Sequence, residues 1–175
     1  MIKIKNILLF VGVLLALTSC KKDDPSEDNN NASDDYTVSV AGTELINNDE
    51  RVYNSIDDVD GNMVLDIKNI SNSIINLQVK VVSIEGTDGA DLELCLGECY
   101  YGVEVGKTYP FADGSVAFYS LDPGEISMQG AAHVLNKDDR NDEIVYELKL
   151  YQVDDNGNEL TSKKSVNFKY KYVAP

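Results

Sequence analysis

The segment Ile144–Leu150, which reads IVYELKL, decides the fold class of this chain of 175 residues. Its even-numbered positions are large and apolar, whereas Glu147 and Lys149 between them are charged. Apolar residues at every second position are typical of a strand buried on one face, because successive side chains in a strand point to opposite sides. The segment therefore predicts a half-buried strand, which continues to Val153.

A second strand follows this one closely. Residues Asp154–Asn158 are turn formers, and the pair Asn156 and Gly157 suits the positive φ angles of a tight hairpin. The returning segment Val166–Tyr172 alternates again, with apolar residues at its even-numbered positions. The two alternating segments therefore predict an antiparallel hairpin.

Earlier parts of the chain show the same alternation. Met63–Lys68 and Ile75–Val81 are strong strand candidates, joined by the turn-like segment Asn69–Ser73. Weaker candidates lie at Tyr36–Ala41, Asp91–Leu94, Ser115–Leu121 and Ile126–Val134. Seven or eight short strands with turns between them predict an all-β fold, a single antiparallel β-sandwich that spans residues 36–175.

Residues 1–19 have the parts of an export signal. Lys3 and Lys5 are basic, residues 7–17 form an apolar run of 11 residues, and a small residue precedes Cys20. The run is too short for a transmembrane helix, which needs about 20 apolar residues. Leu17–Cys20 resembles the lipobox of bacterial lipoproteins, which implies cleavage before Cys20 and attachment of diacylglycerol and fatty acid, such as palmitate, to that cysteine. The alternatives are an ordinary signal peptide with a coincidental cysteine, or a buried strand.

Residues 20–35 are predicted to form a flexible, disordered tether behind the lipid anchor. They are polar and acidic and include three consecutive asparagines, so they cannot bury the apolar surface that folding requires. The charges directly after Cys20 resemble the surface-export signal of Bacteroidota lipoproteins. This resemblance implies an outer-membrane lipoprotein exposed at the cell surface; a periplasm-facing lipoprotein is the alternative.

Charge limits the partners of this protein. The chain has 15 basic and 30 acidic residues, a formal net charge of −15 at pH 7. Such a surface repels phosphate backbones, so we expect no nucleic-acid partner. The expected partners are the membrane, reached through the lipid, and a protein or glycan ligand. We expect no cofactor beyond the covalent lipid on Cys20.

The two remaining cysteines, Cys95 and Cys99, are close in sequence. Export makes a disulfide chemically possible, and Gly97 between them lets the backbone turn tightly. So short a loop gains only about 2 kcal/mol from cross-linking, so the bond would fix one local loop. Free thiols are the alternative. A metal site would need more ligands, and the single histidine, His133, is distant in sequence.

The order of these features resembles the immunoglobulin-like domains of Bacteroidota secreted proteins and lipoproteins. A strand pair precedes Cys95–Tyr100, which reads CLGECY, and Tyr109–Phe111, Leu121–Glu125 and the final hairpin follow. In that family a C-x-G-x-C-Y segment precedes a turn of the L-x-P-G-E type. The resemblance spans roughly Glu50 to Tyr172. It implies an immunoglobulin-like sandwich on an exported protein and no shared activity.

The motifs of the common hydrolases are absent from the sequence. There is no G-x-S-x-G motif, and no sequence motif indicates a nucleophilic residue near His133. We expect His133 to lie at a strand edge. Asp138, Asp139 and Asp142 lie in an acidic loop that could hold a calcium ion, although a solvated loop is the simpler interpretation.

Four of the ten tyrosines surround the cysteine loop in sequence: Tyr100, Tyr101, Tyr109 and Tyr119. They could form a surface that stacks on sugar rings or on peptide. The alternative is that they pack within the sandwich or cap its edges.

The sequence therefore predicts a non-catalytic, lipid-anchored surface module that binds, adheres, or serves as an accessory to an outer-membrane complex. The alternative function is a glycan-binding accessory lipoprotein of an outer-membrane polysaccharide-uptake system. A hydrolase would require a deep pocket in which an aspartate converges with His133.

Overall fold

The computed structural model describes residues 34–111 and 117–175. The predicted signal peptide, the predicted lipidation site Cys20 and most of the predicted tether lie outside these ranges, as does the start of the predicted strand Ser115–Leu121. The described residues form strands and no helix, as the alternation of apolar residues predicts. In these ranges no helix has the length and apolarity that a transmembrane span requires.

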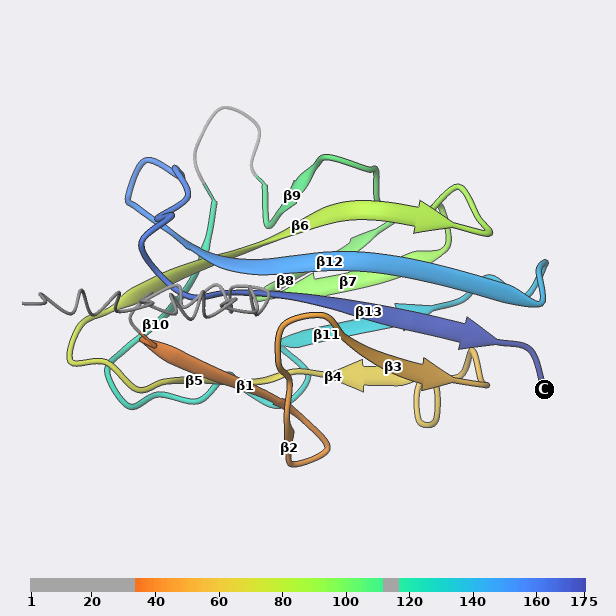
Figure 1. Cartoon of the computed structure of the whole chain (residues 1–175), viewed down its shortest axis with the longest axis horizontal. Coiled ribbons are helices and arrows are strands. Elements are labelled where there is room, and N and C mark those ends of the chain that lie inside the picture. Colours follow the sequence, from red (N-terminus) through yellow and green to blue (C-terminus); the bar gives the residue numbers. More distant parts are fainter. Residues whose placement is uncertain (1–33, 112–116) are drawn as a thin grey trace, which may run out of the picture. The chain divides into compact units, whose positions relative to one another are not determined.

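The described residues contain thirteen strands, more than the seven or eight predicted (Figure 1). The additional strands are short, such as β2 and β9 with two residues each, or lack a clear alternation, such as β3, which reads DERVY. The strands are β1 (Tyr36–Val40), β2 (Thr43–Glu44), β3 (Asp49–Tyr53), β4 (Asn62–Val64), β5 (Asp66–Asn69), β6 (Ile75–Glu85), β7 (Leu92–Leu96), β8 (Glu98–Tyr101), β9 (Thr108–Tyr109), β10 (Tyr119–Leu121), β11 (Ala132–Asn136), β12 (Glu143–Val153) and β13 (Ser165–Val173).

The hairpin that decides the fold class lies in a six-stranded sheet. β12 and β13 pair antiparallel, with Tyr146 opposite Tyr170 and Leu148 opposite Phe168, and all four side chains are buried. The order of this sheet is β10-β6-β12-β13-β3, and β9 also pairs with β6. β3 runs parallel to β13, so this one pair departs from the predicted antiparallel pattern.

The connection between β12 and β13 is longer than the predicted tight turn. Gly157 has a φ of +79°, but Asn156 does not share the positive φ that a two-residue Asn-Gly turn requires. Instead, the Asp154 carboxylate accepts hydrogen bonds from the backbone N–H groups of Asn156 and Asn158, each at 2.9 Å. This side chain folds the segment locally, and β13 begins only at Ser165.

The predicted strand Met63–Lys68 is divided between two sheets. β4 pairs with β11 in a four-stranded sheet of order β4-β11-β7-β8, whereas β5 pairs with β1 in a three-stranded sheet of order β2-β1-β5. At the break, the Leu65 N–H donates to the Ala132 carbonyl at 2.9 Å. Alternation continues through the break, so Met63, Leu65 and Ile67 are all buried. The following strand β6 belongs to the six-stranded sheet, so the two predicted strands do not pair with each other.

Buried side chains from all three sheets share one hydrophobic core, and the domain is an all-β sandwich. Three buried tyrosines bond from one sheet toward another through their hydroxyl groups, and one of them is Tyr146 of β12, which donates to Asn136 Oδ1 of β11 at 3.0 Å. Tyr36 of β1 donates to the Leu150 carbonyl of β12 at 3.1 Å, and Tyr170 of β13 donates to the Gly61 carbonyl beside β4 at 2.7 Å. Burial raises the pKa of the Tyr36 and Tyr170 phenols, so they remain neutral donors.

Candidate functional site

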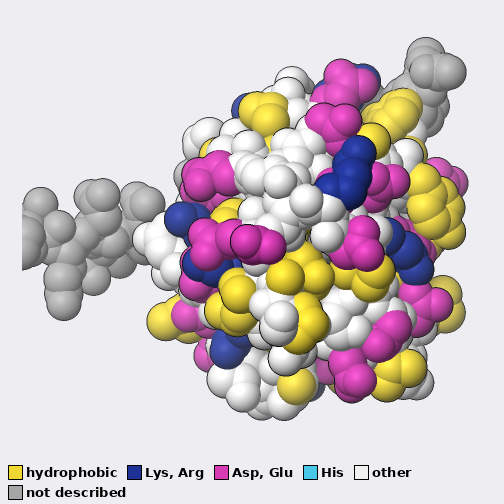
Figure 2. All heavy atoms as spheres, turned by 90° about the vertical axis from the view of Figure 1, so that its right-hand side faces the viewer, with side chains coloured by type: hydrophobic (Ala, Val, Ile, Leu, Met, Phe, Trp, Pro, Cys, Tyr) yellow, Lys and Arg dark blue, Asp and Glu magenta, His cyan; other side chains and the backbone are white. Residues whose placement is uncertain are grey.

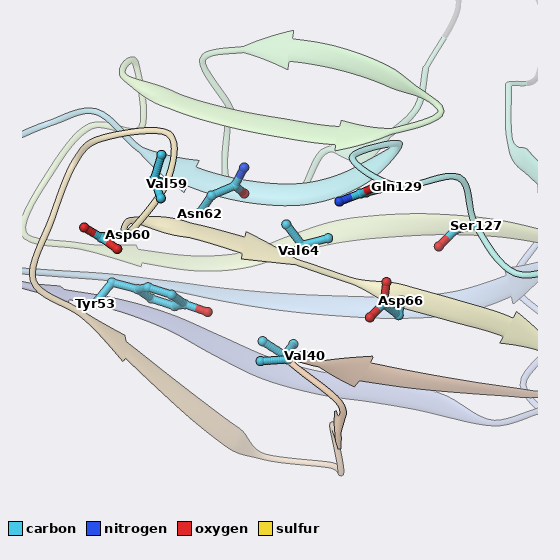
Figure 3. A pocket seen from close by; sticks show the side chains of 10 residues that line it. Val40, Tyr53, Val59, Asp60, Asn62, Val64, Asp66, Ser127 and Gln129 are labelled. Carbon is cyan, nitrogen blue, oxygen red and sulfur yellow. The ribbon is translucent and has the colours of Figure 1, made fainter.

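A groove of about 640 Å³ opens beside the point at which the chain passes from β4 into β5. Its apolar lining includes Val40 at the end of β1, Tyr53 at the end of β3, Val59 in the loop before β4, and Val64 of β4. Figure 3 shows Val64 on β4 and, across the groove, Val40 and Tyr53. β4 is the last strand of its sheet, so the groove lies against a sheet edge.

Carboxylates set the charge of this groove. Asp60 and Asp66 line it and are exposed, and the described lining residues include no lysine or arginine. The side-chain oxygen of Asn62, also in the lining, is buried and has no hydrogen-bond partner among the described residues. The groove therefore offers hydrogen-bond acceptors and negative charge, which favour a ligand that carries donors and positive charge.

The pairing of β3 with β13 fixes Tyr53 at the groove. Its ring stacks on that of Tyr170, with the ring centroids 4.7 Å apart and the planes within 8° of parallel. Burial raises the pKa of the Tyr53 phenol, and the Arg51 charge partly offsets this rise. The sequence does not predict this part of the groove, because the polar β3 segment shows no alternation of apolar residues and its parallel partner β13 lies far along the chain.

The predicted disulfide between Cys95 and Cys99 is present. It joins residues that are directly opposite each other on β7 and β8. The chain reverses at Gly97, whose φ is +76°, and a side chain there would meet the Tyr119 ring at 2.7 Å. The cross-link therefore fixes one local loop at the edge of the four-stranded sheet, as the short spacing predicts.

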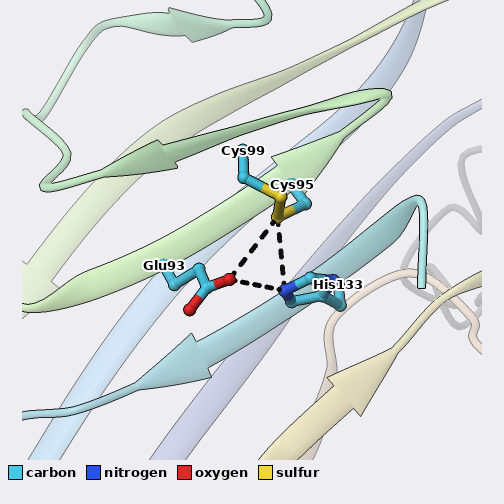
Figure 4. Close-up of side chains that lie close together, drawn as sticks. All are labelled: Glu93, Cys95, Cys99 and His133. Atoms are coloured by element: carbon cyan, nitrogen blue, oxygen red, sulfur yellow. Dashed lines mark hydrogen bonds and ion pairs between the residues drawn. A yellow bond between two sulfur atoms is a disulfide. The ribbon is translucent and has the colours of Figure 1, made fainter.

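His133 lies beside this disulfide and within the sheet. β11 runs between β4 and β7, and His133 is opposite Cys95 in the pairing of β11 with β7. Its Nε2 atom is 3.2 Å from Cys95 Sγ and 3.3 Å from Glu93 Oε1 (Figure 4). The predicted position of His133 at a strand edge is therefore wrong, because the alternation within a strand does not reveal its neighbours in the sheet.

The four predicted tyrosines do not share one exposed surface. Tyr109 is only 2% exposed and belongs to the core, whereas Tyr101 is 77% exposed and Tyr119 is half-buried. Tyr100 is half-buried, and its ring lies 5.0 Å from that of Phe111, between centroids. Because neighbouring residues on a strand point to opposite faces, Tyr100 and Tyr101 of β8 cannot serve the same surface. On the face of β8 that carries Tyr100, the exposed aromatic surface is the pair formed by Tyr100 and Phe111.

The acidic loop after β11 contains a buried carboxylate. Asp138 accepts hydrogen bonds from Arg140 Nη2 at 2.6 Å and from Thr87 Oγ1 at 2.5 Å. The Arg140 guanidinium and the Thr87 hydroxyl hold the pKa of the Asp138 carboxyl well below its usual range. Asp139 and Asp142 are exposed. Among the described residues these three aspartates do not converge as a ligand group, and Asp138 is not the solvated residue that the sequence predicts.

Comparison with known proteins gives similarity of architecture only. No protein-family model matches the chain, and no curated protein matches it. Among solved structures, it is similar to the N-terminal domain of PorA, with 19% identity, coverage of 78% of this chain and 96% of that chain, and a TM-score of 0.48. It is also similar to PapD-like domain 7 of human CEP192, with 9% identity, coverage of 91% and 96%, and a TM-score of 0.44. These values assign neither a family nor an activity.

Proposed function

We propose that this protein is a lipid-anchored, non-catalytic interaction module of a bacterial cell surface. We further propose that the groove beside β4 binds an extended, basic segment of a protein partner. The groove is the observation that carries the binding proposal, because its volume of about 640 Å³ lies within the range of ligand pockets, about 300–1,000 Å³. The lipobox-like segment Leu17–Cys20 supports the anchor.

The position of the groove favours an extended partner. β4 is the last strand of its sheet, and an added strand commonly binds at such an edge through main-chain hydrogen bonds. Val40 and Val64 offer apolar contacts to every second side chain of such a segment. Asp60 and Asp66 favour lysine or arginine at the positions between, in keeping with the net charge of −15. Acidic side chains are also more widespread than basic ones on the face of the molecule drawn in Figure 2.

Two labelled peptides test the groove in a fluorescence-anisotropy titration of the full chain. One alternates lysine with valine and the other alternates glutamate with valine. We expect the lysine peptide to bind, with an affinity that falls as salt concentration rises, because salt screens exposed charges. We expect the glutamate peptide not to bind.

Val64→Lys places a positive charge within the groove and should abolish binding of the lysine peptide. Val82→Lys is the matched control, because Val82 is a strand valine that is 38% exposed on β6 and outside the lining. Equal binding by the two variants, or equal binding of the two peptides, would show that the groove is not the site.

The anchor is tested separately by incorporation of labelled palmitate. The full chain should take up label and fractionate with membranes, and Cys20→Ser should do neither. Protease added to intact cells then tests surface exposure; cleavage only after the outer membrane is permeabilised would place the protein on the periplasmic side. Recovery of the uncut, unlabelled chain in the cytosol would refute anchoring altogether.

A second candidate is the glycan-binding accessory lipoprotein of an outer-membrane polysaccharide-uptake system. The observation that favours it is the aromatic pair of Tyr100 with Phe111, which is 45% exposed and can stack on a sugar ring. Binding on a glycan array that is lost in Phe111→Ala, and retained in Val64→Lys, would favour this function over peptide binding.

A further inference from the structure

Four potential metal ligands from three strands converge at the disulfide. Glu93 and Cys95 belong to β7, Cys99 to β8 and His133 to β11, and one ligand atom from each lies within 4.8 Å of the others. The sheet register produces this convergence, because Cys95 is opposite Cys99 on one side and opposite His133 on the other. Figure 4 shows the carboxylate and the imidazole both directed toward the Cys95 sulfur.

The ring of His133 is oriented in the manner of a metal-binding histidine. Its Nδ1 atom is 2.8 Å from the Gly130 carbonyl oxygen, which can only accept, so Nδ1–H donates to that carbonyl. Nε2 is directed at Cys95 Sγ and Glu93 Oε1, and because a carboxylate oxygen only accepts, the contact with Glu93 is made by Nε2–H as the donor. A bound metal ion would replace that proton on Nε2. A backbone carbonyl that fixes the histidine tautomer in this way is a common feature of metal sites.

The separations between these atoms suit a four-coordinate zinc ion. Bonds of about 2.3 Å to sulfur and about 2.1 Å to nitrogen or oxygen place tetrahedral ligands about 3.4–3.8 Å apart, so shifts of about 0.1–0.4 Å bring three of the ligand atoms to these separations. Nε2 of His133 is 3.2 Å from Cys95 Sγ and 3.3 Å from Glu93 Oε1, and those two atoms are 3.9 Å from each other. The fourth ligand, Cys99 Sγ, has to move away because it is bonded to Cys95 Sγ in the disulfide.

We propose that, when the disulfide is reduced, these four side chains bind one Zn²⁺ ion, and that the disulfide and the metal exclude each other. The reductant is a dithiol, which becomes a disulfide while the cysteine pair gains two electrons and two protons. Zn²⁺ then binds the two cysteines as thiolates and displaces those two protons. Oxidation by a disulfide partner reverses both steps and releases the ion.

The surroundings of the pair allow this exchange. Cys99 is exposed, whereas Cys95 is only 1% exposed, so a thiolate of the dithiol can attack Cys99 Sγ and release Cys95 as the leaving thiolate beside His133. The second thiol of the reductant then frees Cys99. Zn²⁺ with two thiolates and a carboxylate carries a net charge of −1. The Lys137 ammonium, which is paired with Asp58 and lies 3.8 Å from Glu93 Oε2, partly compensates it.

The test uses the full chain with the substitution Cys20→Ser, so that Cys95 and Cys99 are the two cysteines that remain. The protein is reduced with a phosphine, freed of reductant without oxygen, and titrated with Co²⁺ and then with Zn²⁺. We expect one equivalent of Co²⁺ to bind, with a thiolate-to-cobalt charge-transfer band and the visible bands of tetrahedral cobalt, and Zn²⁺ to displace it. The disulfide form should show neither spectrum.

Variants then test the ligand set. His133→Gln and Glu93→Gln should each weaken Zn²⁺ binding by about 10-fold or more. Cys99→Ser, at an exposed position, should lower the charge-transfer intensity by about half, since one of the two thiolates is lost. Glu98→Gln is the matched control, because Glu98 lies between the cysteines but on the other face of β8, where it accepts a hydrogen bond from Tyr100 at 3.1 Å.

Circular dichroism checks that each variant keeps its strand content, so that a loss of binding is not a loss of fold. Equal metal binding by the reduced and disulfide forms would overturn the proposal, as would no binding by either. Unchanged Zn²⁺ affinity in a folded His133→Gln variant would show that the cysteines alone hold the metal and that the four-ligand site is wrong.

Discussion

Replacing Tyr170 with phenylalanine removes a single oxygen atom at the junction of the core and the groove. Tyr170 is fully buried, and its hydroxyl donates to the Gly61 carbonyl at 2.7 Å. Its ring also supports Tyr53, which is stacked 4.7 Å away at the groove. Phenylalanine keeps the ring and its contacts, so the variant isolates the contribution of the hydroxyl group, which bonds Gly61 and also interacts with the backbone N–H of Asn136.

The expected decrease in the free energy of unfolding can be estimated from this hydrogen bond. A hydrogen bond between neutral groups contributes about 0.5–1.5 kcal/mol, and a buried acceptor left without a donor costs about 1–3 kcal/mol. Gly61 is buried, and its own N–H donates to the Asp57 carbonyl at 3.0 Å, so its peptide group cannot turn easily toward water. We therefore expect the free energy of unfolding to fall by about 1–2 kcal/mol. In a domain of this size the corresponding fall in Tm is about 2–8 °C.

Urea unfolding followed by circular dichroism, repeated as a thermal scan, measures this change. The matched control is Tyr172→Phe, because Tyr172 is also buried, at 4% exposed, but its hydroxyl makes no hydrogen bond within the described residues. We expect that control to lie within about 0.5 kcal/mol of the unaltered chain. Equal unfolding midpoints for the two variants would refute the reasoning, since of these two tyrosines only Tyr170 donates a hydrogen bond to Gly61.

Three further outcomes follow from described contacts. Gly97→Ala should lower the Tm of the domain more than Gly106→Ala. Both sites have a positive φ, which costs an alanine about 1–3 kcal/mol of strain, but of the two only Gly97 would place its new methyl group 2.7 Å from the Tyr119 ring. Equal Tm values for the two variants would contradict this. The Asp138 carboxyl has a lowered pKa in the folded state, so its stabilising effect should be complete above about pH 5 and decrease as pH falls below the unfolded value of about 3.9. Urea unfolding from pH 7 to pH 2.5 should show this loss in the unaltered chain and in Asp139→Asn but not in Asp138→Asn. Millimolar Ca²⁺ should leave the Tm unchanged, because Asp138 already binds Arg140 and Thr87; a Tm that rises with Ca²⁺ would show that the acidic loop binds the ion.

Local sequence patterns were sufficient to predict the features that depend only on residues close to one another in the chain. The alternation in Ile144–Leu150 and Val166–Tyr172 fixed two strands and their buried faces, because successive side chains of a strand point to opposite sides whatever the strand pairs with. The Cys95–Cys99 disulfide was predictable for the same reason: the two sulfur atoms are four residues apart, and Gly97 permits the reversal between them.

Only the tertiary structure decided which strands lie side by side. It brought His133 to Cys95, paired the polar β3 with β13, and divided Met63–Lys68 between two sheets, which opened the groove. It also buried Tyr109 in the core and left Tyr101 exposed. Pairing between distant strands depends on the combined packing of the whole core, and no single stretch of sequence carries that information. The groove and the ligand cluster therefore could not be predicted, although the predicted strands overlap every strand that forms them apart from β3 and β8. The overlap is only partial for β11, which begins at Ala132 and not at the predicted Ile126.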